Sequence, residues 1–241
     1  MLLARSNESA EPLTLAAADA LVHGTDTRVL YSDGDELLEA TVSEAHNRYR
    51  DVVAGAIARY VPASAIAELG AGFGSVVLNL ARRPELASMQ FFAAELTESG
   101  TRMISALSAA EDVIIHTGRC DLTGAPITDM PIPPGAVIYT SYAAQYVPLL
   151  SSTFVEQLAL FAPSAVIHIE PCHEHCEEKT LLGLMRRRYI EVNDYNTNLV
   201  TVLHEQRDRG VIEILEERPA VFGTNPLLAA SVIVWRPLRR Y

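Results

Sequence analysis

Short apolar segments alternate with helical stretches through the middle of the chain. The apolar runs predict five strands, at residues 66–69, 89–95, 113–116, 136–141 and 165–170. Apolar positions spaced three or four residues apart predict helices between most of them, at 75–83, 99–109 and 153–161. Strands that alternate with helices form a parallel sheet whose two faces are covered by the helices. The pattern therefore predicts an α/β fold.

The alternation of predicted strands and helices ends after the fifth predicted strand. A long helical pattern covers about 178–205, and an asparagine-rich stretch at 193–198 interrupts it. Asparagine is a poor helix former, so this stretch either caps a turn or contacts a ligand. Two further strands, at 211–217 and 229–235, have only a loop between them, which predicts a C-terminal antiparallel hairpin. The full prediction is a seven-stranded, mostly parallel Rossmann-like sheet with helices on both faces.

The segment before the first strand is predicted to be helical. Residues 13–23 form a short helical pattern, and residues 36–60 form a longer one with an apolar stripe. A segment this short buries little core alone, so its stripe is expected to dock on the rest of the protein. We therefore divide the chain into an N-terminal helical lid at 1–60, whose first dozen residues are expected to be mobile, and a main domain at 61–241.

The charge balance narrows the class of partner. The 241 residues carry a net charge of −11, so the surface on average repels a phosphate backbone, and we expect no nucleic-acid partner. No apolar run approaches the ~20 residues that span a bilayer, and the N-terminus lacks an apolar core of signal-peptide length. Three cysteines form no disulfide framework. We expect a cytoplasmic protein without membrane association; its oligomeric state stays open, with a homodimer as one option.

A glycine-rich loop follows the first predicted strand. Gly70, Gly72 and Gly74 stand at alternate positions, where a backbone without Cβ atoms can turn tightly and approach a bound nucleoside. A dinucleotide-binding loop would place its third glycine at position 75, which is Ser75 here. Glu68 precedes the loop inside the strand, where its carboxylate would repel a pyrophosphate and attract an ammonium group. The loop therefore favours a cationic cofactor without phosphate.

Two further carboxylates follow at the ends of the next predicted strands. Glu95 ends the second strand, at a distance from the loop that suits hydrogen bonds to both ribose hydroxyls. Asp121 lies between Cys120 and Leu122 after the third strand, where a carboxylate beside a backbone amide can bind an adenine edge. Together with the glycine loop, these positions outline a nucleoside site.

The three motifs together resemble those of class I S-adenosylmethionine-dependent methyltransferases. They occur in the family's order and at its spacing, and the resemblance covers about 61–241. It implies S-adenosylmethionine as the cofactor and transfer of its methyl group as the reaction. The residues that it implies for cofactor binding are Glu68, Gly70, Gly72, Gly74, Glu95, Cys120, Asp121, Leu122 and Ser141.

In this family the acceptor lies beside the fourth strand. Members that methylate amino groups of bases or amides often carry an Asn/Asp-Pro-Pro-aromatic signature there, whereas this chain has Thr-Ser-Tyr-Ala at 140–143. That substrate class is disfavoured, and a small-molecule acceptor is expected. Tyr139, Tyr142 and Tyr146, with Gln145, are candidates for the acceptor pocket; packing between sheet and helix is the alternative for each tyrosine.

The most unusual composition in the chain is at the end of the fifth predicted strand, where residues 168–176 concentrate histidines, cysteines and glutamates. Methyl transfer to a hydroxyl needs an aligned acceptor and a base that takes its proton, and histidine suits that role near neutral pH. We predict His173 as the base, with Glu170 orienting it and His175 as the substitute. Tyr142 is expected beside the transferred methyl group. The alternatives are a zinc site with the two neighbouring cysteines, whose spacing is tight for four ligands, and an ordinary polar loop; we predict no metal.

The sequence thus predicts methyl transfer from S-adenosylmethionine to a small molecule, with oxygen as the preferred acceptor atom, then nitrogen, then carbon. Three alternatives stay open. One is a protein that binds S-adenosylmethionine for a different reaction or for binding alone. Another is a nicotinamide-dependent oxidoreductase, which the spacing of the glycines disfavours. The third is a nucleic-acid or protein methyltransferase, which the net charge and the fourth-strand residues disfavour.

Overall fold

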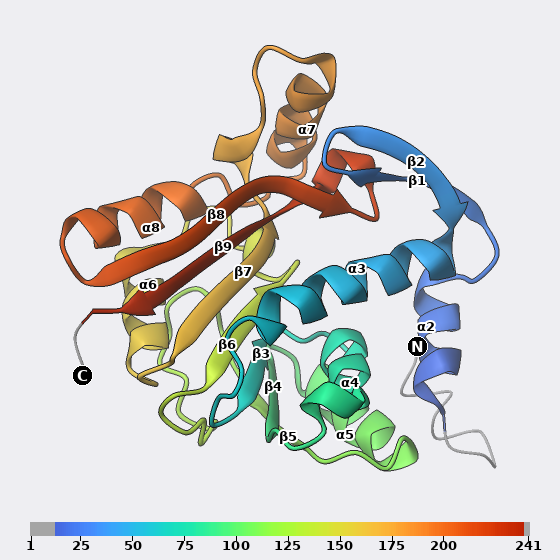
Figure 1. Ribbon diagram of the computed structural model, residues 1–241, viewed down its shortest axis with the longest axis vertical. Helices are drawn as coiled ribbons and strands as arrows, with labels where there is room; N and C mark the ends of the chain where they lie inside the picture. The colour runs from blue at the N-terminus through green and yellow to red at the C-terminus, as the bar shows by residue number, and fades with distance from the viewer. Residues whose placement is uncertain (1–12, 239–241) are drawn as a thin grey trace.

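The computed structural model describes residues 13–238, which form a mixed nine-stranded sheet with helices on both faces (Figure 1). The first twelve residues of the predicted lid, expected to be mobile, lie outside this part. The strands are β1 (Arg28–Asp33), β2 (Glu36–Thr41), β3 (Ile66–Leu69), β4 (Phe91–Glu95), β5 (Ile115–Arg119), β6 (Val137–Ser141), β7 (Ala165–Pro171), β8 (Ile212–Gly223) and β9 (Ala230–Pro237). The α-helices are α2 (Leu15–His23), α3 (Val42–Ala58), α4 (Ser75–Ala81), α5 (Glu98–Ala110), α6 (Ser152–Ala159), α7 (Leu181–Val192) and α8 (Leu199–Asp208). None of these helices is long and apolar enough to cross a membrane.

Five neighbouring strands of the sheet are parallel. Across the sheet the order is β2-β1-β8-β9-β7-β6-β3-β4-β5, and the strands from β7 to β5 run in one direction. β9 pairs antiparallel with β7 and with β8, so the predicted closing hairpin is confirmed. The chain order reverses at β3, which lies between β4 and β6. Such a reversal is the place where open α/β sheets bind ligands, at the carboxyl ends of the strands.

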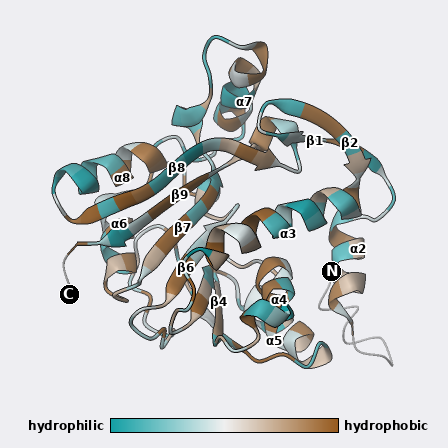
Figure 2. Ribbon diagram, in the orientation of Figure 1, coloured by the Kyte–Doolittle hydropathy of each residue, from teal (hydrophilic) through white to brown (hydrophobic). Residues whose placement is uncertain are grey.

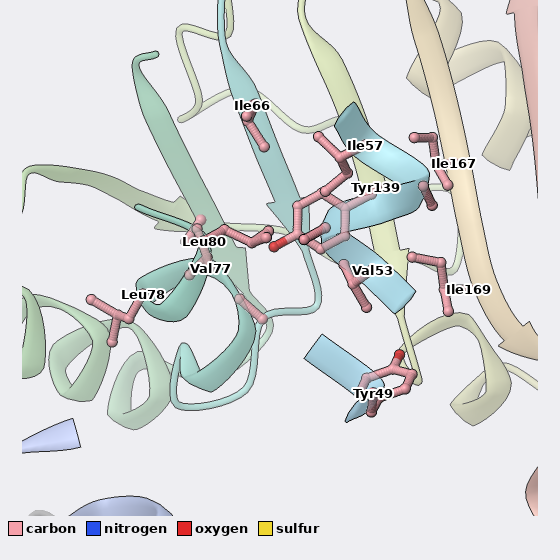
Figure 3. Packing of buried hydrophobic residues seen from close by; sticks show 14 of the residues in the cluster. Tyr49, Val53, Ile57, Ile66, Val77, Leu78, Leu80, Tyr139, Ile167 and Ile169 are labelled. Carbon is pink, nitrogen blue, oxygen red and sulfur yellow. The ribbon is translucent and has the colours of Figure 1, made fainter. Parts of the chain in front are cut away.

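Alternate residues of the central strands face two hydrophobic cores. Ile66 of β3 and Tyr139 of β6 belong to a core with Val53 and Ile57 of α3 (Figure 3). The intervening strand residues, such as Ile138, belong to a second core with α6 and α8. Figure 2 shows the central strands as largely apolar and the helices as mixed, as expected for a sheet covered on both faces. α3 is thus part of the main core, although its sequence precedes the first central strand.

The prediction of seven strands is wrong, because a hairpin adds two at the sheet edge. The sequence predicts that residues 36–41 begin a helix; in the structure they form β2, which pairs with β1, and β1 pairs with β8. α3 begins only at Val42 because Thr41 and Glu44 form a capping box, in which each side chain accepts a hydrogen bond from the other's backbone N–H. Gly34, with φ of +59°, lies in the tight turn between the two strands.

The asparagine-rich stretch separates two helices. The helical pattern predicted at 178–205 is divided into α7 and α8. The Asn196 side chain accepts a hydrogen bond from the Leu199 N–H and donates one to the Val147 carbonyl. It therefore binds the first N–H of α8, whose N-cap residue is Asn198, and ties the start of the helix to the loop after β6. Of the two interpretations that the sequence allows, this geometry supports the cap.

Candidate functional site

Two adjoining cavities open at the carboxyl ends of the central strands. The first cavity, of about 510 Å³, lies against the loops that follow β3, β4, β5 and β6. The second cavity, of about 360 Å³, is lined by α2, by α3 and by the connection between β8 and β9. The cavities meet at residues that line both: Ser75, Val76, Ser141, Tyr142 and Tyr146.

The structure brings nearly all of the predicted cofactor residues together. Those that line the first cavity are Glu68, Gly70, Gly72, Glu95, Cys120, Asp121, Leu122 and Ser141. Gly74 does not line the cavity; it is the N-cap of α4, with φ of +87°. Its role is conformational, because this left-handed backbone favours glycine.

The other two glycines of the loop have different roles. A Cβ atom on Gly70 would lie 2.4 Å from the Cβ of Ala143, so glycine allows the loops after β3 and β6 to pack closely. A Cβ atom on Gly72 would meet no atom within 4 Å, and Gly72 lines the first cavity. The space beside Gly72 is therefore open to a ligand, as a close backbone approach to a nucleoside requires.

Glu68 lies beneath the glycine loop and is buried. Its Oε2 atom accepts hydrogen bonds from the Val77 N–H at 3.0 Å and from the Tyr139 hydroxyl at 2.9 Å. Tyr139 is therefore a core residue. Burial raises the pKa of Glu68 to about 8. A cation in the cavity would favour the charged carboxylate and lower this pKa, so the predicted ammonium contact requires the loss of a proton.

Glu95 joins the end of β4 to the glycine loop. Its carboxylate accepts hydrogen bonds from the Gly72 N–H at 3.1 Å and from the Thr97 N–H at 3.2 Å. Gly100 makes room for it, because a Cβ atom there would lie 2.4 Å from the Cγ of Glu95. The carboxylate is thus fixed at the cavity wall beside Gly72, where ribose hydroxyls would need an acceptor.

The loop after β5 supplies another wall of the first cavity. Asp121 accepts a hydrogen bond from the Thr123 N–H at 2.9 Å, and this bond lowers the pKa of its carboxyl. Burial raises the pKa of Cys120 to about 12, so this thiol is a neutral surface and not a nucleophile. The loop therefore offers a carboxylate beside an apolar surface, which suits an adenine ring.

Ser141 and Tyr142 mark the junction of the two cavities. Tyr142 has φ of +51°, a left-handed conformation that is rare for a tyrosine, and its hydroxyl donates to the Leu228 carbonyl at 2.7 Å. The Ser141 Oγ atom lies 2.6 Å from the Tyr49 hydroxyl of α3. The end of β6 is thereby tied to two walls of the second cavity. Strained backbone held in this way is common at functional sites.

Glu170 fixes the turn after β6 from inside the protein. Its carboxyl accepts hydrogen bonds from the N–H groups of Ala143, Ala144 and Gln145 at 3.0–3.3 Å. Burial raises its pKa to about 7, and these hydrogen bonds oppose the rise. Glu170 is not among the residues that line either cavity. Its observed partners are backbone groups of the turn after β6, and not His173 as the sequence suggests.

The two histidines after β7 lie outside both cavities. The Nε2 atom of His173 is 3.3 Å from the Glu191 carboxylate of α7. The ring of His175 lies between the Ser231 hydroxyl at 2.8 Å and the Glu217 carboxylate at 2.9 Å. Neither histidine lines the first or the second cavity, because this loop packs against α7, β8 and β9. The structure therefore does not bring the predicted base to the predicted cofactor site.

Two other histidines line the second cavity. His23 of α2 and His46 of α3 stack with their ring centroids 4.0 Å apart. Burial lowers the pKa of both, that of His46 to about 4, while Asp19 opposes the lowering at His23. Sequence reasoning missed them because they lie far from every motif. The one available signal was that His46 and Tyr49 are three residues apart and therefore share a helix face.

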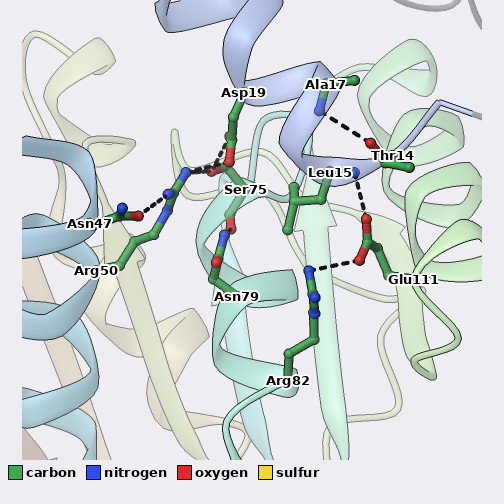
Figure 4. A network of polar contacts seen from close by, with 10 residues as sticks. All are labelled: Thr14, Leu15, Ala17, Asp19, Asn47, Arg50, Ser75, Asn79, Arg82 and Glu111. Atoms are coloured by element: carbon green, nitrogen blue, oxygen red, sulfur yellow. Dashed lines mark hydrogen bonds and ion pairs between the residues drawn. The ribbon is translucent and has the colours of Figure 1, made fainter. Parts of the chain in front are cut away.

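A polar network connects the N-terminal helices to the start of α4 (Figure 4). Asp19 accepts hydrogen bonds from Arg50 at 2.6 Å and from the Ser75 hydroxyl at 2.7 Å. Arg50 also donates to the Ser75 hydroxyl at 2.8 Å and to Asn47 at 2.9 Å. Arg50 is only 8% exposed, and Asp19 balances its charge. The two side chains therefore form a largely buried ion pair. Since Ser75 lines both cavities, the network joins α2 and α3 to the junction.

The cysteines after β7 are not grouped with other possible metal ligands in the part of the chain that the structure describes. Within residues 13–238, no three His, Cys, Asp or Glu side chains are grouped so that they could hold a metal ion. Cys172 and Cys176 are free thiols, and burial raises the pKa of Cys176 to about 11.

Comparison with known proteins relates the whole architecture to methyltransferases. No family model matches the sequence, and no curated protein matches it. A structure described as a sarcosine dimethylglycine methyltransferase from Galdieria sulphuraria has a TM-score of 0.60 at 12% identity, over 92% of this chain and 97% of that one. The plantazolicin methyltransferase BpumL with S-adenosylhomocysteine has a TM-score of 0.56 at 12% identity, over 82% and 88%. Magnesium protoporphyrin IX methyltransferase from Synechocystis PCC 6803 with S-adenosylmethionine has a TM-score of 0.53 at 12% identity, over 81% of each chain.

The chain therefore has the fold of the class I S-adenosylmethionine-dependent methyltransferases. The parallel strands, the reversal at β3 and the closing antiparallel hairpin agree with the resemblance that the motifs indicate. At this level of identity the likeness establishes the fold, and the chemistry depends on the residues of the two cavities.

Proposed function

We propose that this protein transfers a methyl group from S-adenosylmethionine to a small molecule, with oxygen as the preferred acceptor atom. The observation that carries the proposal is the first cavity, where Gly72 leaves open space beside the fixed carboxylate of Glu95. The second cavity supplies an adjoining site for an acceptor. The fold supports the same reaction class, because its structural neighbours include methyltransferases with this cofactor or its product bound.

The residues of the first cavity fit this cofactor. S-adenosylmethionine, when bound, supplies a methyl group on a positively charged sulfur. Glu95 would accept hydrogen bonds from the ribose hydroxyls, and Asp121 would bind the adenine edge. Glu68, once it loses its proton, would compensate an ammonium group. Gly72 would allow the backbone to approach the nucleoside without a Cβ atom in the way.

The acceptor would meet the methyl group at the junction formed by Ser141 and Tyr142. Methyl transfer needs in-line alignment, and the two walls tied to these residues would hold the acceptor in place. An acceptor hydroxyl must also lose its proton. Because His173 and His175 lie outside the cavities, we assign the role of base to His23, which lines the second cavity in its neutral form. We propose that no metal takes part.

We further propose that the N-terminal segment covers the acceptor. His23, His46 and Tyr49 all contribute to the second cavity, so α2 and α3 form one of its walls. The Val53 and Ile57 side chains hold α3 in the main core, which restricts any opening to α2. Amide hydrogen exchange with and without S-adenosylhomocysteine tests this: protection of α2 on binding would support a cover, and an unchanged pattern would count against it.

Isothermal calorimetry with S-adenosylhomocysteine and with NADH tests the assignment of the cofactor. We expect one S-adenosylhomocysteine per chain and no NADH binding. Tight NADH binding without a response to S-adenosylhomocysteine would reject the proposed function and favour an oxidoreductase.

A further inference from the structure

Tyr146 is a large aromatic side chain that stays exposed at the junction of the two cavities. It is 66% exposed and lines both cavities, as Ser141 and Tyr142 do. A single exposed ring is ordinary on a protein surface. Its place at the junction becomes informative because of how the surrounding chain holds it.

The backbone on both sides of Tyr146 is fixed by one asparagine. The backbone N–H of Asn196 donates to the Gln145 carbonyl at 2.8 Å, and its side-chain Nδ2 donates to the Val147 carbonyl at 2.7 Å. Asn196 itself is only 2% exposed. On the other side of the turn, the Glu170 carboxyl accepts the Gln145 N–H at 3.3 Å. The main chain is thus held at both neighbours of Tyr146, while the ring of Tyr146 is left largely uncovered.

The same asparagine-rich stretch brings a second ring to Tyr146. Tyr195 directly precedes Asn196, and its ring centroid lies 5.6 Å from that of Tyr146 with the two planes at 90°. In such an edge-to-face pair at most one face of Tyr146 is covered, so the other face is free for a flat partner. The contact also restricts rotation of the Tyr146 ring. A ring that is already held loses little conformational entropy when a ligand covers it.

The charges around the second cavity decide which kind of ligand this ring suits. The face of a tyrosine attracts either another ring or a cation. No carboxylate is found among the described residues that line the second cavity, and Arg50 is their one permanent cation. A cation there would lose its hydration and meet Arg50. An anion would gain little, because Asp19 already balances the charge of Arg50. The lining therefore favours an uncharged ring.

We propose that Tyr146 stacks against an aromatic ring of the acceptor and so selects uncharged aromatic molecules for methylation. The aromatic face of Tyr146, and not its hydroxyl, makes the selection. Because Tyr146 lines both cavities, a ring stacked on it lies at the junction, where the methyl group would arrive. This inference rests on the proposed methyl transfer and deepens it by naming the class of acceptor.

Two probes with one carbon skeleton test the preference for a flat ring. 2-Naphthol is aromatic, and decahydro-2-naphthol has the same skeleton and hydroxyl in saturated form. Tetramethylammonium tests binding of a cation. Dissociation constants are measured by ligand-observed NMR on the full chain saturated with S-adenosylhomocysteine. We expect 2-naphthol to bind about fivefold more tightly than decahydro-2-naphthol, as for one aromatic pair beyond the area that it buries, and tetramethylammonium to bind most weakly.

Two substitutions of Tyr146 test whether its face is the origin of the preference. Tyr146→Leu should bind 2-naphthol and decahydro-2-naphthol equally, whereas Tyr146→Phe should keep the wild-type preference because it retains the ring. Tyr60→Leu is the matched control, since Tyr60 is a partly exposed tyrosine after α3 that lines neither cavity. It should also keep the preference. Thermal melts check that the variants fold, and calorimetry checks that each is saturated with S-adenosylhomocysteine.

The possible outcomes separate this inference from the proposed function. Equal binding of the two naphthol probes to the wild type, or tighter binding of tetramethylammonium, would overturn the selection of aromatic acceptors. An unchanged preference in Tyr146→Leu, or its loss in Tyr146→Phe or in Tyr60→Leu, would overturn the role of the Tyr146 face. Failure of all three probes to bind while S-adenosylhomocysteine binds would also overturn it. If S-adenosylhomocysteine does not bind but the probes behave as expected, the proposed cofactor fails and the aromatic site remains.

Discussion

The two cavities are built in different ways, although they share a wall. The first cavity is formed by loops that follow consecutive strands of one parallel sheet. The second cavity combines residues that are far apart in the sequence, from His23 on α2 to Leu228 before β9. The first depends on backbone geometry and strand ends, and the second on how helices and a late hairpin pack around them.

This difference separates what the fold imposes from what this chain adds. Any chain with this sheet has a crevice at the reversal beside β3, and glycines there leave space for a nucleoside. The residues that line the second cavity alone come from segments outside the parallel strands. A substitution in the first cavity should therefore affect cofactor binding, whereas a substitution in the second should affect the acceptor. The following predictions are ordered from the largest expected effect to the smallest.

Gly72→Val should abolish binding of S-adenosylhomocysteine while the protein remains folded. The added side chain would enter the open space of the first cavity. Gly210→Val is the matched control, since Gly210 also has a positive φ and open space around it but lies in the turn before β8. Calorimetry should detect binding to the control alone, with similar melting temperatures for both variants. Normal binding to Gly72→Val would place the nucleoside elsewhere.

His23→Asn should lower the turnover of the acceptor by about a hundredfold, the usual scale of general-base catalysis. His173→Asn should leave the rate unchanged, because that ring contacts Glu191 outside both cavities. The comparison is made at saturating acceptor and cofactor. The opposite ranking of the two variants would restore the loop after β7 as the source of the base.

Asp19→Ala should lower the free energy of unfolding by about 2–3 kcal/mol. It leaves the largely buried Arg50 without its partner, and the cost falls below that of a fully buried pair because the Asp19 side chain keeps 19% of its surface exposed. Asp51→Ala is the control: its partner is also an arginine, Arg83, but Asp51 is 69% exposed, so the loss should be under ~1 kcal/mol. Urea denaturation measures both. Equal losses would show that the network of Figure 4 has no special role in stability.

Glu95→Ala should weaken S-adenosylhomocysteine binding by roughly 1.5–3 kcal/mol, as expected for lost hydrogen bonds to a charged group. Glu98→Ala removes an exposed carboxylate three residues away and should have no effect. Calorimetric titration of both variants gives the difference directly. Unchanged affinity in Glu95→Ala would mean that its carboxylate only holds the loop through Gly72.

The stability that His46 contributes should depend on pH. Its pKa is about 4 in the folded protein and about 6.5 in the unfolded chain, so the unfolded chain binds more protons between these values. Stability is therefore lost as the pH falls from 6.5 to 4. Relative to His46→Asn, the wild type should lose roughly 1–2 kcal/mol over this range, less than the full shift implies because the ring is partly exposed. The raised pKa values of Glu68 and Glu170 act in the opposite direction but cancel in this difference. A constant difference across the range would mean that the ring is not held neutral.

The same contrast explains what the sequence could reveal. Glu68, Gly72 and Glu95 lie in local motifs at strand ends, so their spacing alone predicts the first cavity. His23 and Gln145 are brought together only by the packing of α2, which no local pattern records. The sequence does not reveal the β1–β2 hairpin because the adjacent leucines and glutamates of β2 favour a helix in isolation. The pairing of β2 with β1, and of β1 with β8, overrides that preference. The capping box of Thr41 and Glu44 marks the true start of α3 in the sequence itself.

A crystal structure with S-adenosylhomocysteine bound tests the central claim most directly. The account predicts its ribose beside Gly72 and Glu95, and its sulfur at the junction beside Ser141 and Tyr142, open to the second cavity. A further cavity of about 310 Å³ lies between α2, α3 and α4. Binding of the nucleoside in that cavity, or with its sulfur turned away from Tyr142, would contradict the account.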